Sequence, residues 1–245
     1  MRAGGAGRGE PVMVYITQKQ RTKLSRMAVD GLPVWRLETG SGFFARLRAA
    51  WLLDDLYRSG VRRCICGEGA PVSLAARAGI LPVSVLPLRL ALAGGLVDAL
   101  CPGGLGDGCA VLRCGRGGED AARAVLPVLA GRARYLRLEM DEPAPLAREL
   151  LYRWGIAAGD GGRPAVLTVL CGRHVESGGG RALWLTPDCG RRQRLCWTSP
   201  RAEDAPVPAT EQLCAALVSA GKWQPSDIHI TSLLDIRAGN HYNAT

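Results

Sequence analysis

The sequence predicts an α/β protein in which two successive three-layer units each carry a mainly parallel sheet, with a β-hairpin near the C-terminus. Three observations favour this class. Strand-like and helix-like runs alternate along most of the 245 residues. Most strand-like runs, such as residues 164–171, are apolar throughout, which is typical of parallel strands buried on both faces. A hydrophobic content of 47% provides enough apolar side chains for a large core.

The N-terminal α/β unit is expected over residues 12–101. Runs rich in β-branched and apolar residues predict strands, and runs of helix formers that end at glycine predict helices. The predicted strands are 12–17, 32–38, 61–66 and 81–87, and the predicted helices are 18–31, 42–60, 70–79 and 88–100. In the helix at 42–60 we expect one apolar face, formed by Phe44, Leu47, Ala50, Trp51 and Tyr57.

A second α/β unit is expected over residues 109–236, joined to the first by the turn-rich segment 102–108. Its predicted strands are 109–114, 133–141, 164–171 and 227–235, and its predicted helices are 118–131, 142–155 and 207–221. Thr210 is the candidate N-cap of the last helix. The strand-like runs 182–187 and 194–199 are joined by a turn-rich bridge, so they predict the hairpin.

The two ends of the sequence carry no periodic pattern. Residues 1–11 are interpreted as a disordered leader and residues 237–245 as a flexible tail, and either Met1 or Met13 can be the start. The leader lacks the apolar region of a secretory signal. The most apolar window, residues 80–100, is broken by prolines, glycines and charges and falls short of the roughly 20 apolar residues of a membrane span. We therefore expect a cytoplasmic protein with no membrane partner.

The nine cysteines mostly lie inside apolar runs, which is typical of reduced, buried thiols in a reducing compartment. Cys64 and Cys66 share one face of a strand, and Cys171 and His174 have the spacing of metal ligands. A zinc site needs about four ligands, and a second pair is missing, so we expect no metal. Cys64, Cys66 or Cys114 would act as a nucleophile only beside a histidine, which none of them has in the sequence.

The clearest functional motif is the stretch VLRCGRGGED at residues 111–120. Its glycine cluster lies between a predicted strand and a predicted helix and comprises Gly115, Arg116, Gly117 and Gly118. Two carboxylates, Glu139 and Asp141, end the next predicted strand. In these features residues 109–171 resemble the Rossmann-type NAD(P)-binding superfamily. The resemblance implies a phosphate contact at the glycine cluster and ribose contacts of NAD or NADP at the two carboxylates. The alternation of strands and helices predicts a Rossmann-like layout for both units.

The motif also departs from the family pattern. The third glycine position holds Asp120, and Glu119 stands beside it. Two carboxylates at a helix N-terminus favour the helix and disfavour a bound anion. Arg116 would offset this repulsion in part, or select a 2′-phosphate. The favoured function is therefore a degenerate or non-catalytic nucleotide binder that retains the scaffold of the family.

A second glycine turn, CGEGAP, has the same place after a predicted strand. Gly67 and Gly69 would make the turn, and Glu68 between them raises the same electrostatic objection. This turn is the weaker candidate of the two.

Catalytic patterns are few. His174 follows a predicted strand in a glycine-rich loop, with Glu176 nearby, and would be a general base unless it is an ordinary loop histidine. His229 alternates with isoleucines on a strand, and His241 lies in the tail. The GxSxG, HExxH and GxxxxGK[ST] motifs are absent from the sequence. Catalytic residues are therefore unassigned, and an enzyme is not the favoured class.

Three alternative functions stay open. The formal charge of +9, carried mainly by arginine, suits a basic regulatory or interaction protein that binds nucleic acid or an acidic partner, although few aromatic residues interleave with the charges. An active NAD(P)-dependent oxidoreductase would place its substrate between the two halves. A scaffold protein would use Trp184 and Trp197 of the predicted hairpin as an interface.

Overall fold

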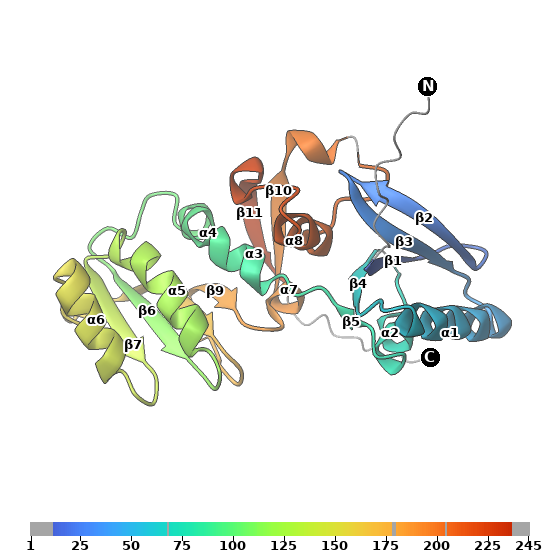
Figure 1. The fold of residues 1–245 in the computed structure, drawn as a ribbon. Coiled ribbons are helices and arrows are strands. Elements are labelled where there is room, and N and C mark those ends of the chain that lie inside the picture. Colours follow the sequence, from blue (N-terminus) through green and yellow to red (C-terminus); the bar gives the residue numbers. More distant parts are fainter. Residues whose placement is uncertain (1–11, 68, 178–179, 204, 237–245) are drawn as a thin grey trace, which may run out of the picture. The chain divides into compact units, whose positions relative to one another are not determined.

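The computed structural model describes residues 12–236 except 68, 178–179 and 204 (Figure 1). The predictions for residues 1–11 and 237–245, for Glu68 and for His241 lie outside the described residues. The chain forms two compact units. One contains the chain up to Ser84 together with Ser199–Asp227, and the other contains Val85–Thr198 together with the chain from Ile228. The segment 102–108 lies inside the second of these units.

The first unit contains a five-stranded sheet of order β2-β3-β1-β4-β5. Four of its strands are parallel: β1 (Met13–Gln18), β3 (Leu32–Thr39), β4 (Arg63–Cys66) and β5 (Leu81–Pro82). The chain enters β3 on one side of β1 and then crosses to β4 on the other side. In open α/β sheets, this reversal marks the edge where ligands bind, at the carboxyl ends of the strands.

The helix predicted at 18–31 is wrong, because this segment forms the edge strand β2 (Lys23–Val29). β2 is antiparallel to β3 and pairs with it along its whole length, from Lys23 opposite Glu38 to Val29 opposite Leu32. Asp30 and Gly31 connect the two strands with φ of 46° and 75°. A two-residue turn with both φ values positive is the tightest hairpin connection, and Asp-Gly is among its preferred sequences. Pairing with β3 therefore overrides the helical propensity of the segment.

Helices cover both faces of this sheet. On one face lie α1 (Phe43–Arg58) and α2 (Val72–Arg77), and on the other lies α8 (Glu211–Ser219) (Figure 1). On the face that α1 and α2 cover, the sheet contributes Val14, Ile16 and Leu37 to the core, and all three are fully buried. Short 3-10 turns at Pro200–Ala202 and Pro225–Asp227 flank α8.

The apolar face predicted for α1 is wrong in its orientation. The helix buries Ala49, Leu53 and Leu56 instead. Phe44 is 81% exposed and Trp51 is 65% exposed. Both stripes have helical spacing, and the aliphatic stripe 49-53-56 fits against the sheet.

Thr210 is the N-cap of α8, as predicted. Its Oγ1 accepts a hydrogen bond of 3.2 Å from the backbone N–H of Leu213. We expect Thr210→Ala to lower the free energy of unfolding by about 1 kcal/mol, because one N-terminal amide loses its partner. Urea unfolding followed by far-UV circular dichroism measures this change. Ser219→Ala, at the exposed last turn of the same helix, is the control and should change stability little. Equal effects of the two variants would contradict the capping role.

The second unit contains a four-stranded sheet of order β7-β6-β8-β9, and all its neighbouring strands are parallel. The strands are β6 (Cys109–Cys114), β7 (Tyr135–Glu139), β8 (Ala165–Cys171) and β9 (Arg181–Leu185). The helices are α3 (Leu86–Ala91), α4 (Ala93–Leu100), α5 (Glu119–Ala130), α6 (Ala144–Trp154) and α7 (Cys189–Arg192). The predicted alternation of strand and helix from β6 to β8 is confirmed.

The predicted antiparallel strand pair near the C-terminus is present, but its members differ from the expected ones. β10 (Gln193–Thr198) pairs with β11 (His229–Asp235), whereas the run expected to be its partner forms β9 beside β8. The side chain of Gln193 covers the outer edge of β9. Its Oε1 accepts from the Trp184 N–H at 3.0 Å, and its Nε2 donates to the Ala182 carbonyl at 2.6 Å. A side-chain amide therefore satisfies the edge that a hairpin partner would have satisfied.

Candidate ligand-binding site

The glycine cluster at residues 115–118 forms the turn between β6 and α5, as predicted. The turn is tied to the chain that follows β8. The N–H of Gly115 donates to the carbonyl of Cys171 at 2.9 Å, and the N–H of Arg173 donates to the carbonyl of Arg116 at 3.0 Å. The turn therefore packs against the neighbouring turn of the same sheet.

The glycines of this turn lack a side chain for two different reasons. A Cβ atom on Gly115 would lie 2.2 Å from the carbonyl oxygen of Arg173, and one on Gly118 would lie 2.6 Å from the backbone N of Gly172. These two glycines therefore admit the neighbouring backbone. Gly117 is exposed, has a φ of +68°, and would place a Cβ atom in open space. Only this glycine leaves room for a ligand.

The carboxylates expected to bind ribose have other surroundings. Glu139 ends β7 and accepts from Arg113 Nε at 2.6 Å, and its other oxygen lies 2.9 Å from Arg137 Nε. Asp141 is exposed. Glu139 thus lies at the same sheet edge as the glycine turn, but two guanidinium groups already engage its oxygens.

The charges at this turn do not suit a phosphate. Glu119 and Asp120 both stand in the first turn of α5. Burial raises the pKa of the Cys114 thiol, and the negative charges of Glu119 and Asp141 raise it further. Carboxylates thus occupy the positive end of α5, where a pyrophosphate would bind. The residues at 115–118 fit a dinucleotide poorly, and phosphate binding at Gly117 stays a prediction.

The other predicted chemistry-bearing residues are dispersed. His174 is exposed with a φ of 57°, whereas Cys171 is fully buried. Among the described residues, no three potential metal-ligating side chains cluster together. The nine thiols are free, and burial raises the pKa of Cys109 and Cys171. The hydrogen bond to Cys66 and burial also raise the pKa of Cys64, so these thiols stay protonated at neutral pH.

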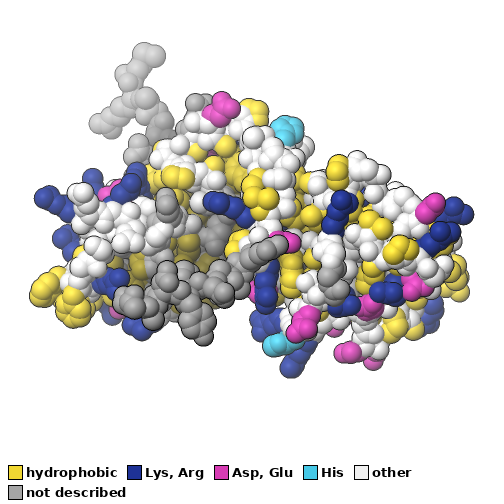
Figure 2. Space-filling model, turned by 180° about the vertical axis from the view of Figure 1, so that it is seen from behind, with side chains coloured by type: hydrophobic (Ala, Val, Ile, Leu, Met, Phe, Trp, Pro, Cys, Tyr) yellow, Lys and Arg dark blue, Asp and Glu magenta, His cyan; other side chains and the backbone are white. Residues whose placement is uncertain are grey.

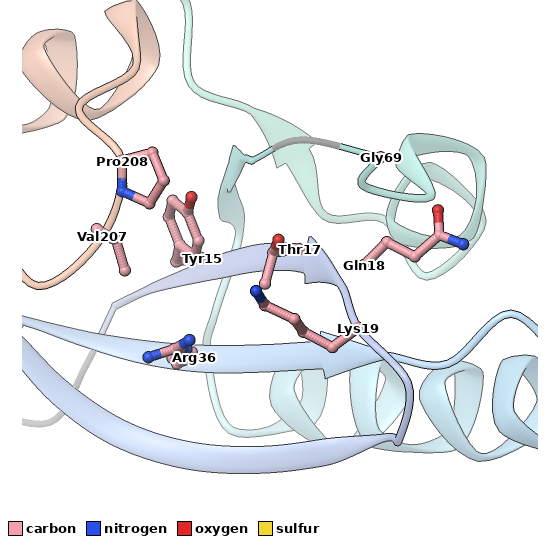
Figure 3. Close-up of a pocket in the computed structure, with 8 residues that line it drawn as sticks. All are labelled: Tyr15, Thr17, Gln18, Lys19, Arg36, Gly69, Val207 and Pro208. Atoms are coloured by element: carbon pink, nitrogen blue, oxygen red, sulfur yellow. The ribbon is translucent and has the colours of Figure 1, made fainter.

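Two cavities adjoin at the carboxyl edge of the sheet in the first unit. The first, of about 430 Å³, is named here the Tyr15 cavity (Figure 3). It is lined by Tyr15, Thr17, Gln18, Lys19, Arg36, Gly69, Val207 and Pro208. Side chains alternate along β1, so Tyr15 and Thr17 face one side of the sheet, and Lys19 directly follows the end of the strand. Val207 and Pro208, which precede α8, border that same side (Figure 3).

A buried polar atom without a partner, in a residue that lines the Tyr15 cavity, points to a ligand. Tyr15, which also lines the cavity, is 2% exposed. Arg36, which lies opposite Tyr15 in the sheet register, pairs with Glu38 through Nη2 at 2.8 Å. Its Nε atom is buried and has no hydrogen-bond partner among the described residues. Leaving a buried donor unsatisfied costs about 1–3 kcal/mol, so the Arg36 Nε favours an acceptor nearby.

The second glycine turn shapes this cavity. A Cβ atom on Gly67 would lie 2.5 Å from the Tyr15 hydroxyl, and one on Gly69 would lie 2.8 Å from Gln18 Oε1. Gly69 also has a φ of +65°, which glycine adopts without strain. The two glycines therefore allow the side chains of β1 to reach the sheet edge. Glu68 lies outside the described residues.

The second cavity, of about 570 Å³, lies beside the N-terminal half of α1 and is named here the Arg46 cavity. It shares Gln18 and Gly69 with the Tyr15 cavity. Its other lining residues are Thr39, Gly40, Ser41, Phe43, Arg46, Leu47, Ala50, Pro71, Ser73, Leu74 and Arg77. Apolar side chains of α1 and α2 thus form its walls, with Arg46 and Arg77 as its charged groups.

Positive charge distinguishes this sheet edge from the glycine turn of the second unit. Lys19, Arg36, Arg46 and Arg77 line the two cavities, and no carboxylate is among their described lining residues. The first turn of α1 contains no acidic residue, and its N-cap, Gly42, makes no side-chain cap. An anion at this edge would therefore meet cations and free helix amides rather than carboxylates.

The second glycine turn, with Gly67 and Gly69, lies at this edge and is the weaker of the two candidates that the sequence indicates. A further local signal is the glycine-containing turn TGSG at residues 39–42, which connects a strand to a long helix without acidic residues in its first turn. The rest of the site has no local signal. Tyr15, Arg36 and Val207 come from distant parts of the chain, and only the fold brings them together.

Comparison with known proteins adds one distant neighbour. No family model and no curated protein sequence matches the chain. Among solved structures, the L-tryptophan dehydrogenase from Nostoc punctiforme matches with 11% sequence identity and a TM-score of 0.29. The match covers 65% of this chain and 56% of that enzyme. By its own fold, the chain is an α/β protein with mainly parallel sheets. Two cavities of ligand size lie at the carboxyl edge of the sheet in its first unit.

Proposed function

We propose that the first unit binds a phosphate-bearing ligand of the nucleotide type at the Tyr15 and Arg46 cavities. The observation that carries the proposal is the buried Nε of Arg36, which has no hydrogen-bond partner among the described residues, in a residue that lines a cavity together with the hydroxyl-bearing Tyr15. Both groups are hydrogen-bond donors. Each cavity has the volume of an ordinary small-molecule site, and the edge is the one where open α/β sheets bind ligands.

The two cavities suit different parts of one ligand. The Tyr15 cavity offers Arg36 and Lys19 as cations and hydroxyls as donors, so it takes the phosphate. The Arg46 cavity offers Phe43, Leu47 and Leu74, so it takes a planar or apolar portion such as a nucleobase. Gln18, which lines both cavities, lies between the two portions.

The chemistry of the site favours binding over catalysis. The described lining residues include no carboxylate and no histidine that would act as a general base. Burial raises the pKa of Tyr15 above its ordinary value, although the charge of Arg36 opposes this effect. At neutral pH the phenol therefore keeps its proton and donates a hydrogen bond. We infer a non-catalytic nucleotide binder. NAD and NADP belong to the ligand panel because an oxidoreductase would have to bind one of them.

Thermal unfolding with a ligand panel tests this proposal. A ligand in large excess over its Kd stabilises the native state, by about 2.7 kcal/mol at 100 times Kd. We expect at least one of ATP, NAD and NADP to raise the Tm of the wild type. S-adenosylmethionine, which has no phosphate, should not raise it. The absence of a shift with every phosphate-bearing ligand would contradict the proposal.

Substitutions at the two sheet edges locate the binding. Lys19→Gln should reduce the shift, because it removes a cation from the Tyr15 cavity. Gly117→Val should leave the shift unchanged, because the turn at 115–118 belongs to the other unit. Arg153→Gln, an exposed arginine of α6, is the matched charge control. Loss of the shift in Gly117→Val alone would place the ligand at the glycine turn and overturn the proposal.

A further inference from the structure

An exposed apolar surface covers the N-terminal half of α1. Phe43 is 75% exposed, Phe44 81%, Leu47 42% and Trp51 65%. These four residues are named here the aromatic patch. Residues 43, 47 and 51 follow one another at the four-residue spacing of a helix face, and Phe44 lies beside them. The patch points away from the face of α1 that packs on the sheet through Ala49, Leu53 and Leu56.

The size of the aromatic patch is that of the largest apolar patch on a typical monomer. Large aromatic side chains bury about 150–250 Å² each, so full burial of the patch would remove roughly 400–500 Å² from water. The largest patch on a protein surface is often a functional one. The rings of Phe43 and Phe44 pack edge to face, with centroids 5.6 Å apart and an interplanar angle of 78°.

Positive charges surround the aromatic patch. Arg46 and Arg48 are exposed on α1 itself. The loop that leads into β2 is held against the start of the helix by Thr22, whose Oγ1 donates to the Ala45 carbonyl at 3.1 Å and accepts from Gly40 N–H at 3.2 Å. This loop and the start of β2 carry three exposed cations, Lys19, Arg21 and Lys23. Figure 2 shows hydrophobic side chains at the α1 end of this unit with Lys and Arg side chains around them.

Negative charge on α1 is confined to the other end of the helix. Asp54 and Asp55 begin one turn beyond Trp51, and both are exposed. The N-terminal half of the helix, with its neighbouring loop, is therefore apolar at the centre and basic at the rim. This arrangement is typical of helices that lie in the interface of an anionic bilayer, with Trp, Phe and Leu inserted and Lys and Arg at the headgroups.

We propose that the aromatic patch docks on the surface of a membrane that contains anionic lipids. Charge complementarity between the basic rim and the headgroups selects this partner. A second copy of the chain would bring like charges together, and the patch is smaller than the roughly 800 Å² per partner of a stable interface. Single-stranded nucleic acid needs open ring faces for stacking, whereas Phe43 and Phe44 pack edge to face.

Docking of this kind requires no membrane span, so the short apolar window from which we expected no membrane partner does not oppose it. Among the described residues, no helix is long and apolar enough to cross a bilayer. An interfacial helix inserts only its apolar side, and its binding strength follows the buried apolar area and the attraction to anionic lipids. Phe43 and Leu47 of the patch also line the Arg46 cavity. The proposal is therefore tested through Phe44 and Trp51, which line neither the Tyr15 cavity nor the Arg46 cavity.

Vesicle flotation with the full chain tests the proposal. We expect the wild type to float with vesicles of phosphatidylcholine and phosphatidylserine at low salt, and to stay in solution with phosphatidylcholine alone. Phe44→Ser combined with Trp51→Ser should weaken binding roughly tenfold or more, because two inserted side chains are lost. Arg48→Gln should weaken it about fivefold. Asp54→Asn combined with Asp55→Asn should strengthen it.

A matched control distinguishes insertion of the aromatic patch from nonspecific adsorption to vesicles. Tyr152→Ser removes an aromatic side chain of α6 that is 84% exposed, and it should leave vesicle binding unchanged. The proposal is overturned if the wild type fails to bind anionic vesicles, or if Phe44→Ser with Trp51→Ser binds as well as the wild type. It is also overturned if this double variant abolishes self-association in sedimentation or binding to single-stranded DNA while vesicle binding persists.

Discussion

Arg36→Gln is expected to bind ATP, NAD or NADP, whichever gives the largest thermal shift with the wild type, about 50-fold more weakly than the wild type does. The guanidinium of Arg36 has a buried Nε without a partner among the described residues, and it lines the Tyr15 cavity. Hydrogen bonds to a charged acceptor contribute about 1.5–3 kcal/mol, so losing this donor reduces affinity strongly. Isothermal titration calorimetry measures the change in Kd.

The same substitution should have little effect on folding. Arg36 forms its ion pair with Glu38, and the two side chains are 32% and 24% exposed. Partly exposed pairs of this kind contribute little to stability. Arg58→Gln is the control for charge, because Arg58 is 79% exposed at the far end of α1. Equal losses of affinity in the two variants would show that net charge, rather than the cavity, holds the ligand.

Gly118→Ala is expected to lower the free energy of unfolding of the second unit by about 3 kcal/mol. A Cβ atom on Gly118 would lie 2.6 Å from backbone atoms of Cys171 and Gly172, which cannot move aside as a flexible side chain would. β8 would have to shift away from the turn between β6 and α5. Urea unfolding followed by far-UV circular dichroism measures this loss.

Gly117→Ala is the matched control at the neighbouring position. A Cβ atom there meets nothing within 4 Å, and only the φ of +68° opposes a side chain. The left-handed conformation costs a non-glycine residue about 1–2 kcal/mol. A loss of stability in Gly117→Ala as large as in Gly118→Ala would contradict the packing role of Gly118. Nucleotide binding by Gly117→Ala should equal that of the wild type.

Periodicity predicted the helices and the parallel strands where local pattern and packing agree. The run CAVLRC forms the buried strand β6, and Gly155 ends α6 with the φ of 67° that its place as a stop residue requires. β2 was predicted as a helix because its residues are good helix formers, and only its partner β3 makes it a strand. The Asp30-Gly31 turn was the available signal for that pairing.

The candidate site was harder to predict, because its residues are contiguous only in the fold. The glycine cluster at 115–118 matches a phosphate motif in spacing, yet two of its glycines make room for the chain at 171–173. Of the residues that line the Tyr15 cavity, only Gly69 belongs to a motif, the second glycine turn. The lining residues lie on two strands, two loops and the segment before α8. α1 presents two apolar stripes in the sequence, and periodicity alone does not indicate which one packs on the sheet.

A crystal structure with the best-binding nucleotide of the panel tests the central claim most directly. We predict density for a phosphate within hydrogen-bond distance of Arg36 Nε and the Tyr15 hydroxyl, with the remainder of the ligand in the Arg46 cavity. Density for the phosphate at Gly117 and the first turn of α5, with the Tyr15 cavity filled only by water, would contradict the account.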